Sequence, residues 1–339
     1  MKKTLKYILG IFAILILLAA YAAYSLLSSP FGIAEKAYVY IDDDDDMDSV
    51  YQKVRETGEV SNMLGFTITS KIKGTEKPKT GKYAITPGED MLTFARHMLN
   101  GMQEPVHLVV PEVRTVSDMA ERLGKSLMLS SEDLLSVLND STFMDSLGYS
   151  KENVPCLFVP NTYDVYWNIS PKNLVLRLHK EKERFWTQER QDKAKACGFT
   201  KEQVVTLASI VESETSYNPE KSRIAGLYIN RLRTDMPLQS DPTVIFALQD
   251  FTIRRVSKDH LKVESPYNTY TNIGLPPGPI RIPSVRGIDA VLDYEQNDYL
   301  YMCAKEDFSG SHNFTSSYNE HLSNARKYQS ALNTLGIKK

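Results

Sequence analysis

A run of 21 residues without charge, Tyr7–Leu27, follows the three lysines at the start of the chain. A helix of that length spans a hydrocarbon core of about 30 Å. Because lysines precede the run and the acidic segment Asp42–Asp46 follows it, the positive-inside rule places the N-terminus in the cytoplasm. A cleaved signal peptide is the alternative, since Ala20-Tyr21-Ala22 fits a cleavage site. We predict a single-pass protein of the cytoplasmic (inner) membrane, with its larger part on the periplasmic or extracellular side.

The charge balance of the chain argues against nucleic acid as a partner. It has 40 Lys+Arg and 42 Asp+Glu residues, a formal net charge of -2, whereas a nucleic-acid-binding protein usually shows a basic excess. Its three cysteines include no CxxC pair, and an odd number cannot form a complete set of disulfides. We expect three reduced, mostly buried thiols, with one disulfide plus a free thiol as the alternative. They are Cys156, Cys197 and Cys303.

The sequence predicts no metal and no cofactor. No pair of histidines or cysteines has the spacing of a zinc site, and no phosphate-binding glycine motif occurs. The five aspartates Asp42–Asp46 lack the alternating ligands and the glycine of a calcium loop, so we expect a solvated acidic turn there. His312 and His321 lie nine residues apart, and we expect them to cap helices or pack in the core.

A pattern of strand, polar turn and short helix occurs three times, over Ile41–Val54, Ile85–Met98 and Val110–Leu123. In each copy an apolar residue ends a β-rich run, and three more follow at the spacing of one helix face. The residues in the N-cap position are Asp46, Asp90 and Thr115. This arrangement resembles LysM-like modules, which bind glycans that contain N-acetylglucosamine. A small α/β spacer domain is the alternative.

A helix that ends at Glu214 offers one candidate acid. Thr200 and Gln203 fit a capping box that opens it, and its apolar stripe contains Val204, Ala208 and Val211. At 100° per residue, Glu212 and Glu214 lie about 160° apart on opposite shoulders of that stripe, so they cannot both face one cleft. Glu214 has apolar neighbours, which raise the pKa of a carboxyl group and keep it protonated. Two exposed glutamates are the alternative.

The residues after this helix carry a more specific signal. Glu214–Pro219 reads ETSYNP and looks like the E-S-x-F-N-P stretch of lysozyme-like lytic transglycosylases, in which the glutamate is the catalytic acid. Three long motifs follow in order, at Ile224–Leu248, Ser265–Ser284 and His312–His321. From about residue 150 to 335 this succession closely resembles the YceG-like family of endolytic peptidoglycan transglycosylases. The apolar segment and the LysM-like segment ahead of it also match the layout of that family.

The resemblance implies a function and a set of site residues. Glu214 would be the catalytic residue, and the other matching positions would line or support the substrate cleft: Asn218, Asn230, Gln239, Asp241, Tyr267, Asn268, Thr269 and Tyr270. Such an enzyme cleaves the MurNAc–GlcNAc bond of nascent peptidoglycan, forms a 1,6-anhydro-MurNAc end and sets glycan strand length. Its partners would be glycan strands and peptidoglycan synthases. Two alternatives stay open: a muramidase that uses water, with Asp241 as base, and a non-catalytic peptidoglycan-binding scaffold.

The expected fold class is α+β. We also expect a helical stretch over about Lys172–Lys193, before the helix that ends at Glu214. The predicted segments are a cytoplasmic tail over 1–6, a transmembrane helix over 7–27, a LysM-like α/β module over 36–145 and a mixed α+β catalytic domain over 150–339.

Overall fold

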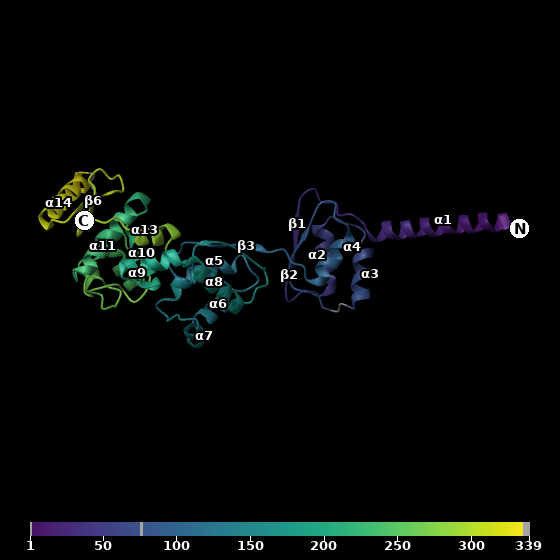
Figure 1. Ribbon diagram of the computed structural model, residues 1–339, viewed down its shortest axis with the longest axis horizontal. Coiled ribbons are helices and arrows are strands. Elements are labelled where there is room, and N and C mark those ends of the chain that lie inside the picture. Colours follow the sequence, from purple (N-terminus) through teal and green to yellow (C-terminus); the bar gives the residue numbers. More distant parts are fainter. Residues whose placement is uncertain (1, 75–76, 335–339) are drawn as a thin grey trace. The chain divides into compact units, whose positions relative to one another are not determined.

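A computed structural model describes residues 2–74 and 77–334 (Figure 1). The chain divides into two compact units, each built from several segments. Unit 1 comprises Met1–Leu108, Ser126–Leu129 and Tyr163–Ile169. Unit 2 comprises Val109–Lys125, Ser130–Thr162 and Ser170–Lys339.

The chain begins with the long helix α1, Lys2–Leu27. Its stretch Thr4–Leu27 is long and apolar enough to cross a membrane, and it is the only such stretch among the described residues. The large apolar side chains of α1 from Leu5 to Leu26 are exposed, and α3 contacts α1. This helix fits a membrane anchor, and it fits a signal sequence equally well.

Unit 1 is built on the antiparallel pair β1 and β2, in which Val39 lies opposite Tyr83. Its elements are β1 (Ala37–Ile41), α2 (Met47–Thr57), α3 (Leu64–Lys73), β2 (Gly81–Ile85) and α4 (Met91–Asn100). Apolar side chains from both strands and all three of these helices form one core. The first two predicted strand–turn–helix units are confirmed. Asp46 and Asp90 cap α2 and α4 by accepting hydrogen bonds from backbone N–H groups.

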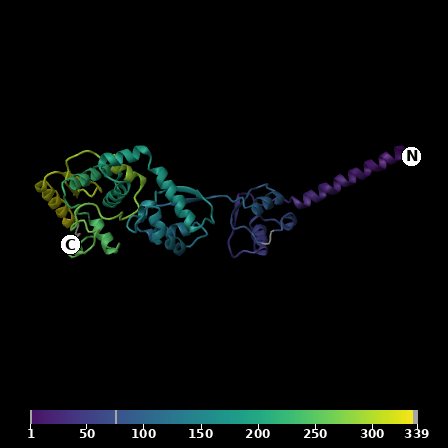
Figure 2. The ribbon, with the colours of Figure 1, turned by 60° about the horizontal axis from the view of Figure 1, so that its bottom comes forward.

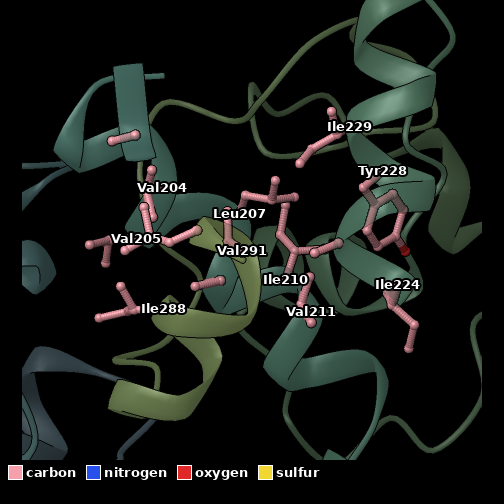
Figure 3. Packing of buried hydrophobic residues seen from close by; sticks show 14 of the residues in the cluster. Val204, Val205, Leu207, Ile210, Val211, Ile224, Tyr228, Ile229, Ile288 and Val291 are labelled. Atoms are coloured by element: carbon pink, nitrogen blue, oxygen red, sulfur yellow. The ribbon is translucent and has the colours of Figure 1, made fainter. Parts of the chain in front are cut away.

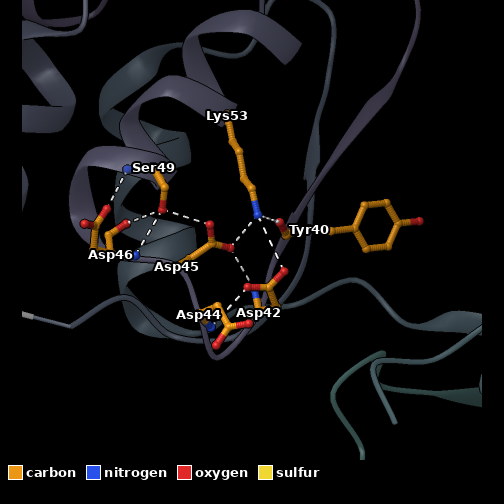
Figure 4. A network of polar contacts seen from close by, with 7 residues as sticks. All are labelled: Tyr40, Asp42, Asp44, Asp45, Asp46, Ser49 and Lys53. Carbon is orange, nitrogen blue, oxygen red and sulfur yellow. Dashed lines mark hydrogen bonds and ion pairs between the residues drawn. The ribbon is translucent and has the colours of Figure 1, made fainter. Parts of the chain in front are cut away.

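The acidic turn between β1 and α2 is less solvated than the sequence suggested (Figure 4). Asp45 is only 8% exposed, and its carboxylate lies 2.5 Å from the Lys53 ammonium group. It also accepts hydrogen bonds from the Asp42 backbone and from the Ser49 hydroxyl. Burial favours the neutral acid, but these donors hold the pKa of Asp45 below its ordinary value. The expectation of a solvated turn is therefore wrong at Asp45, which ties the turn to α2.

The third copy of the pattern forms its predicted elements but packs elsewhere. β3 (Val106–Val110) pairs with β4 (Asn161–Val165), and α5 (Val116–Gly124) packs against α6 (Ser131–Leu138). Thr115 caps α5 as predicted. Each of the strands β3 and β4 has some residues in unit 1 and the others in unit 2, and α5 belongs to unit 2. The compact units therefore do not follow the predicted segments 36–145 and 150–339.

The predicted helical stretch over Lys172–Lys193 is helical in the structure, and it is divided between two helices. α8 (Pro171–Phe185) ends where Trp186 leaves the helical conformation, with ψ of 68°. Thr187 then caps α9 (Gln188–Cys197). The two short elements ahead of them in unit 2 are α7 (Ser141–Ser146) and the 3-10 turn η1 (Val154–Leu157).

The helix α10, Lys201–Glu214, lies in the core of unit 2 (Figure 3). Each residue from Val204 to Val211 is buried, so α10 is covered on all sides and not along the one predicted stripe. It packs against α11 (Lys221–Arg233), α12 (Asp241–Leu248) and α13 (Val285–Leu292), and the short 3-10 turns η2 (Asn218–Glu220) and η3 (His260–Lys262) lie in the connections.

The chain closes with a β-hairpin and a helix. β5 (Tyr301–Ala304) and β6 (His312–Thr315) pair antiparallel, and α14 (Tyr318–Thr334) packs beside them (Figures 1 and 2). The expectation of reduced thiols is confirmed, since Cys156 and Cys197 are free and buried and Cys303 is free and partly buried.

Candidate active site

The Glu214 carboxyl group is held at the C-terminal end of α10 by two hydroxyl groups. The Tyr228 hydroxyl, from α11, donates a hydrogen bond of 2.7 Å to Oε1 of Glu214. The Ser240 hydroxyl, just before α12, donates a second, short hydrogen bond to the same oxygen. Among the described residues, no hydrogen-bond donor or acceptor contacts the other oxygen, Oε2. One carboxyl oxygen is thus fixed by the protein, and the other is left for a ligand.

A cavity of about 320 Å³ in unit 2 opens beside this carboxyl group. Its lining comes from α10, α11, the segment that leads into α12, the loop after α12, the β5–β6 hairpin and α14. The lining residues are Glu214, Leu227, Tyr228, Arg231, Leu238, Gln239, Asp241, Tyr270, Met302, Cys303, Ala304, His312 and His321. Most of these side chains are polar, which suits a ligand rich in hydroxyl and amide groups.

The surroundings of Glu214 favour its protonated form. Burial raises the pKa of Glu214 above the ordinary value, and the negative charge of Asp241 acts in the same direction. The hydrogen bonds from Ser240 and Tyr228 and the charge of His312 oppose this rise without cancelling it. A carboxyl group with a raised pKa retains a proton that it can donate, which a general acid requires.

Three of the predicted site residues share the cavity with Glu214. Asp241 and Tyr270 form a pair, since the Tyr270 hydroxyl donates a hydrogen bond of 2.6 Å to the Asp241 carboxylate. Gln239 lines the cavity with an exposed side chain and a φ of 52°. Its backbone N–H donates to the Thr269 carbonyl oxygen, 3.0 Å away.

Two further predicted residues lie beneath the cavity and do not line it. The buried Thr269 hydroxyl accepts a hydrogen bond from the Ser240 N–H, 3.0 Å away, so it fixes the segment that carries the hydroxyl bound to Glu214. Asn268 is fully buried, and its amide donates to the carbonyl oxygens of Leu261 and Val263. Thr269 and Asn268 are therefore support residues in this structure.

The remaining three predicted residues lie away from the cavity. The Asn230 amide donates to carbonyl oxygens of Asn297 and Tyr299, which fastens α11 to the chain before β5. The Tyr267 ring packs on the Phe246 ring, with centroids 4.8 Å apart. Asn218 lines a different hollow, which also contains Glu212. The structure does not bring these three side chains to Glu214.

Glu212 lies on the other side of α10, as the helix geometry predicts. Its carboxylate forms an ion pair of 2.6 Å with Lys221 and accepts a hydrogen bond of 2.7 Å from Ser284. The Glu212 side chain is 9% exposed and the Lys221 side chain 4% exposed. Glu212 therefore joins α10 to α11 and α13 and does not enter the cavity.

Two histidines line the cavity, where the sequence suggested capping or core packing. The Nδ1 atom of the His312 ring lies 2.9 Å from one carboxylate oxygen of the buried Glu220, and the backbone N–H of His312 donates to the other oxygen. His321 stacks on the Tyr301 ring, and its Nδ1 is buried with no hydrogen-bond partner among the described residues. No group of three metal-ligating side chains occurs in the described ranges.

The sequence matches the YceG-like family over residues 39–327. The chain belongs to the YceG-like family. A relative in Bacillus subtilis named endolytic murein transglycosylase is 26% identical over 289 residues, which cover 81% of this chain and 79% of the relative. A relative of the same name in Streptococcus pneumoniae is also 26% identical, over 74% of this chain. This chain spans about half of that longer relative, 51% of its length.

A solved structure agrees with the family assignment. The crystal structure of a protein described as YceG-like from Listeria monocytogenes has 27% sequence identity and a TM-score of 0.56. The match covers 85% of this chain and 99% of that chain. The mixed α+β fold is therefore shared with a YceG-like neighbour.

Sequence reasoning missed several residues of this YceG-like site. Tyr228, Ser240 and Arg231 line or hold the cavity, yet neither periodicity nor a motif with a known mechanism pointed to them. The signal that was present, the closing motif with His312 and His321, was interpreted as structural. The fold brings both histidines to the cavity of Glu214, although about 100 residues separate them from Glu214 in the sequence.

Proposed function

We propose that this chain is an endolytic murein transglycosylase in which Glu214 is the single acid–base residue. The observation that carries the proposal is the asymmetric environment of its carboxyl group. Tyr228 and Ser240 both bind Oε1, while Oε2 has no partner in the described part of the chain. The named relatives in Bacillus subtilis and Streptococcus pneumoniae support the same activity.

In the first step Glu214 acts as an acid. The raised pKa keeps a proton on the carboxyl group, and the unpaired Oε2 is the atom that donates it to the glycosidic oxygen between MurNAc and GlcNAc. The C–O bond then breaks, and the GlcNAc side leaves as an alcohol. General acid catalysis of this kind contributes about 10²–10⁴-fold. As the proton leaves, Tyr228 and Ser240 stabilise the carboxylate that forms.

In the second step the same carboxylate acts as a base. The 6-hydroxyl of the MurNAc residue attacks its own anomeric carbon, and Glu214 takes the hydroxyl proton, which returns the enzyme to its starting state. The product ends in 1,6-anhydro-MurNAc. An intramolecular attack has a high effective concentration, so this step needs no activated water and no second carboxylate.

The cavity supplies groups that suit a sugar. Gln239 offers an amide, Tyr270 an aromatic ring, and Asp241 a carboxylate that can accept hydrogen bonds from hydroxyl groups. We assign these three to substrate binding, and we assign Thr269 and Asn268 to holding their loop.

One observation favours a second candidate, a muramidase that uses water. Asp241 lines the same cavity as Glu214, and a glycosidase that hydrolyses its substrate requires a second carboxyl group. In that case Asp241→Asn would abolish cleavage, and the products would carry reducing ends. In a transglycosylase the same variant retains cleavage, since Asp241 only binds sugar and orients Tyr270.

The decisive experiment compares Glu214→Gln with a matched variant on the same helix. Glu202→Gln makes the same chemical change 12 residues earlier, about 18 Å away along α10. The assay measures release of 1,6-anhydro-muropeptides from purified glycan strands, with thermal melting as the folding control.

We expect Glu214→Gln to lower the rate at least about a hundredfold, and we expect Glu202→Gln to retain it. Retained cleavage by a folded Glu214→Gln protein would contradict the acid–base role, and it would leave peptidoglycan binding as the function. Products without anhydro ends would favour the muramidase.

The N-terminal part supports a location at the membrane. We propose that α1 anchors the chain, with residues 1–6 in the cytoplasm and the cavity on the outer side, because lysines precede the apolar run. There the enzyme would cut nascent strands beside the peptidoglycan synthases and set strand length. The strands and helices β1, α2, α3 and β2 would act as a LysM-like glycan-binding module. A reporter fused after Lys339 that is active only in the cytoplasm would contradict this topology.

A further inference from the structure

A second, smaller cavity of unit 2 borders the segments that carry the active site. Its volume is about 120 Å³. Ser213, next to Glu214 on α10, lines it, and so does Pro242, next to Asp241 on α12. Because adjacent Cα atoms lie 3.8 Å apart, the two cavities are separated by little more than these two backbone segments. The other lining residues are Arg114, Ile245, Phe246, Phe251, Ile280 and Arg281.

Two arginines give this cavity a positive charge that the protein does not neutralise. The Arg114 guanidinium group lies over the Phe251 ring, 4.8 Å from its centroid. Nε of Arg281 is buried and has no hydrogen-bond partner in the described part of the chain. Neither Arg114 nor Arg281 forms an ion pair with a described residue. A buried, unpaired donor on a charged group is rare, and it indicates a partner that comes from outside the chain.

Hydrogen bonds of neighbouring residues join the chain segments that carry the two arginines. The N–H of Ile282 donates to the carbonyl oxygen of Val113, 2.9 Å away, so the neighbours of Arg281 and Arg114 are joined directly. The N–H of Ile280 donates to the Ser209 hydroxyl of α10, 3.0 Å away. Ile280 and Ile282 are both buried, and they hold Arg281 between them. The backbone on both sides of Arg281 is therefore held in the core, next to the segment that carries the exposed Arg114.

We propose that this cavity binds a carboxylate of the peptide stem attached to the MurNAc residue that is cleaved at Glu214. The inference rests on the proposed function and deepens it by naming a second recognition site. Arginine is suited to planar carboxylates, because its guanidinium group donates two parallel hydrogen bonds. The volume equals about four water molecules, which is room for a carboxylate and one small side chain.

The dimensions and the apolar wall fit the same ligand. A stem of five residues extends to about 17 Å, several times the 3.8 Å between adjacent residues such as Ser213 and Glu214, which line the two cavities. The wall formed by Pro242, Ile245 and Phe246 suits the methyl group of an alanine residue. Two carboxylates of the stem have the required chemistry, the one on its glutamate and the one at its C-terminus, and the experiment distinguishes them.

The experiment measures KM and kcat of the full chain on four kinds of glycan strand. The first carries stems with all carboxylates free, the second has the glutamate carboxylate amidated, the third has the terminal carboxylate amidated, and the fourth has its stems removed. The variants are Arg281→Gln and Arg114→Gln. Arg122→Gln is the matched control, since Arg122 is an exposed arginine of unit 2 that does not line the cavity.

We expect wild-type protein to have a KM at least about tenfold lower on strands with free carboxylates than on stripped strands. Arg281→Gln should lose this difference and keep the wild-type kcat and KM on stripped strands, and Arg122→Gln should behave as wild type. If wild-type protein has the KM of stripped strands on one of the two amidated strands, the carboxylate that is amidated in that strand is the one bound by the cavity.

Two results would overturn the inference. One is an equal KM of the wild type on all four strands. The other is an Arg281→Gln variant that retains the preference, or that loses activity equally on every strand. Activity of wild type and of Glu214→Gln on stripped strands tests the proposed function separately, because no stem is present there.

Discussion

Removing the Tyr228 hydroxyl tests whether the two hydrogen bonds on Oε1 set the proton affinity of Glu214. The change Tyr228→Phe leaves the ring of this buried side chain in place and removes one donor, 2.7 Å from the carboxyl oxygen. That hydrogen bond stabilises the ionised carboxylate more than the neutral acid, so it lowers the pKa of Glu214. Without it the pKa of Glu214 rises further.

The size of the effect follows from the bond that is lost. A hydrogen bond to a charged group contributes about 1.5 kcal/mol at the lower end of its usual range, and one pH unit corresponds to 1.36 kcal/mol. Since the acid must be protonated in the free enzyme, kcat/KM falls as the pH rises through the pKa of Glu214. We therefore expect the alkaline limb of the pH profile to move upward by about one unit in Tyr228→Phe.

The control for this experiment is Tyr149→Phe. Tyr149 is also a buried tyrosine of unit 2, but its hydroxyl group contacts the His179 ring, 2.9 Å away, and it lies outside the Glu214 cavity. Both variants should lose about 1 kcal/mol of unfolding free energy, and only Tyr228→Phe should move the limb. An unchanged limb in a folded Tyr228→Phe protein would refute the reasoning, since Tyr228 would then act on stability alone.

Two further predictions concern stability. Because the pKa of Glu214 is raised, wild-type protein loses stability as the pH rises from the unfolded-state pKa, about 4.3, through the folded-state pKa. Glu214→Gln has no such loss, so its unfolding free energy relative to wild type should increase with pH. A difference in melting temperature that stays constant between pH 4 and 8 would contradict this. Glu212→Gln leaves the buried Lys221 without its partner and should cost about 3–5 kcal/mol of unfolding free energy, measured with denaturant. The double variant Glu212→Gln with Lys221→Met should recover most of that loss. Equal stability of Glu212→Gln and wild type would show that the ion pair contributes nothing.

The sequence predicted local structure well where one residue decides it. Asp46, Asp90 and Thr115 each cap the helix that was expected after them, because a side-chain oxygen one position before a helix acts on its own backbone neighbours. The opposite placement of Glu212 and Glu214 also follows from helix geometry alone. Such features depend on residues within one or two turns.

The parts that sequence reasoning missed depend on contacts between distant segments. Tyr228 meets Glu214 because α11 returns alongside α10, and His312 meets Glu220 across 92 positions of the chain. Trp186 ends α8 inside the stretch that was predicted to be helical, and no local pattern marked that break. Local spacing carries no information on these pairings, because tertiary packing decides them.

The interleaved composition of the two units has a consequence for how such a protein can be rearranged by recombination. Unit 1 includes the short segments Ser126–Leu129 and Tyr163–Ile169, which lie within the sequence of unit 2. A single crossover near residue 108 would therefore join most of one relative's unit 1 to these two segments of the other relative. Exchange of a complete unit 1 between relatives requires that all three of its segments be inherited together. We therefore expect the two units to have the same evolutionary history.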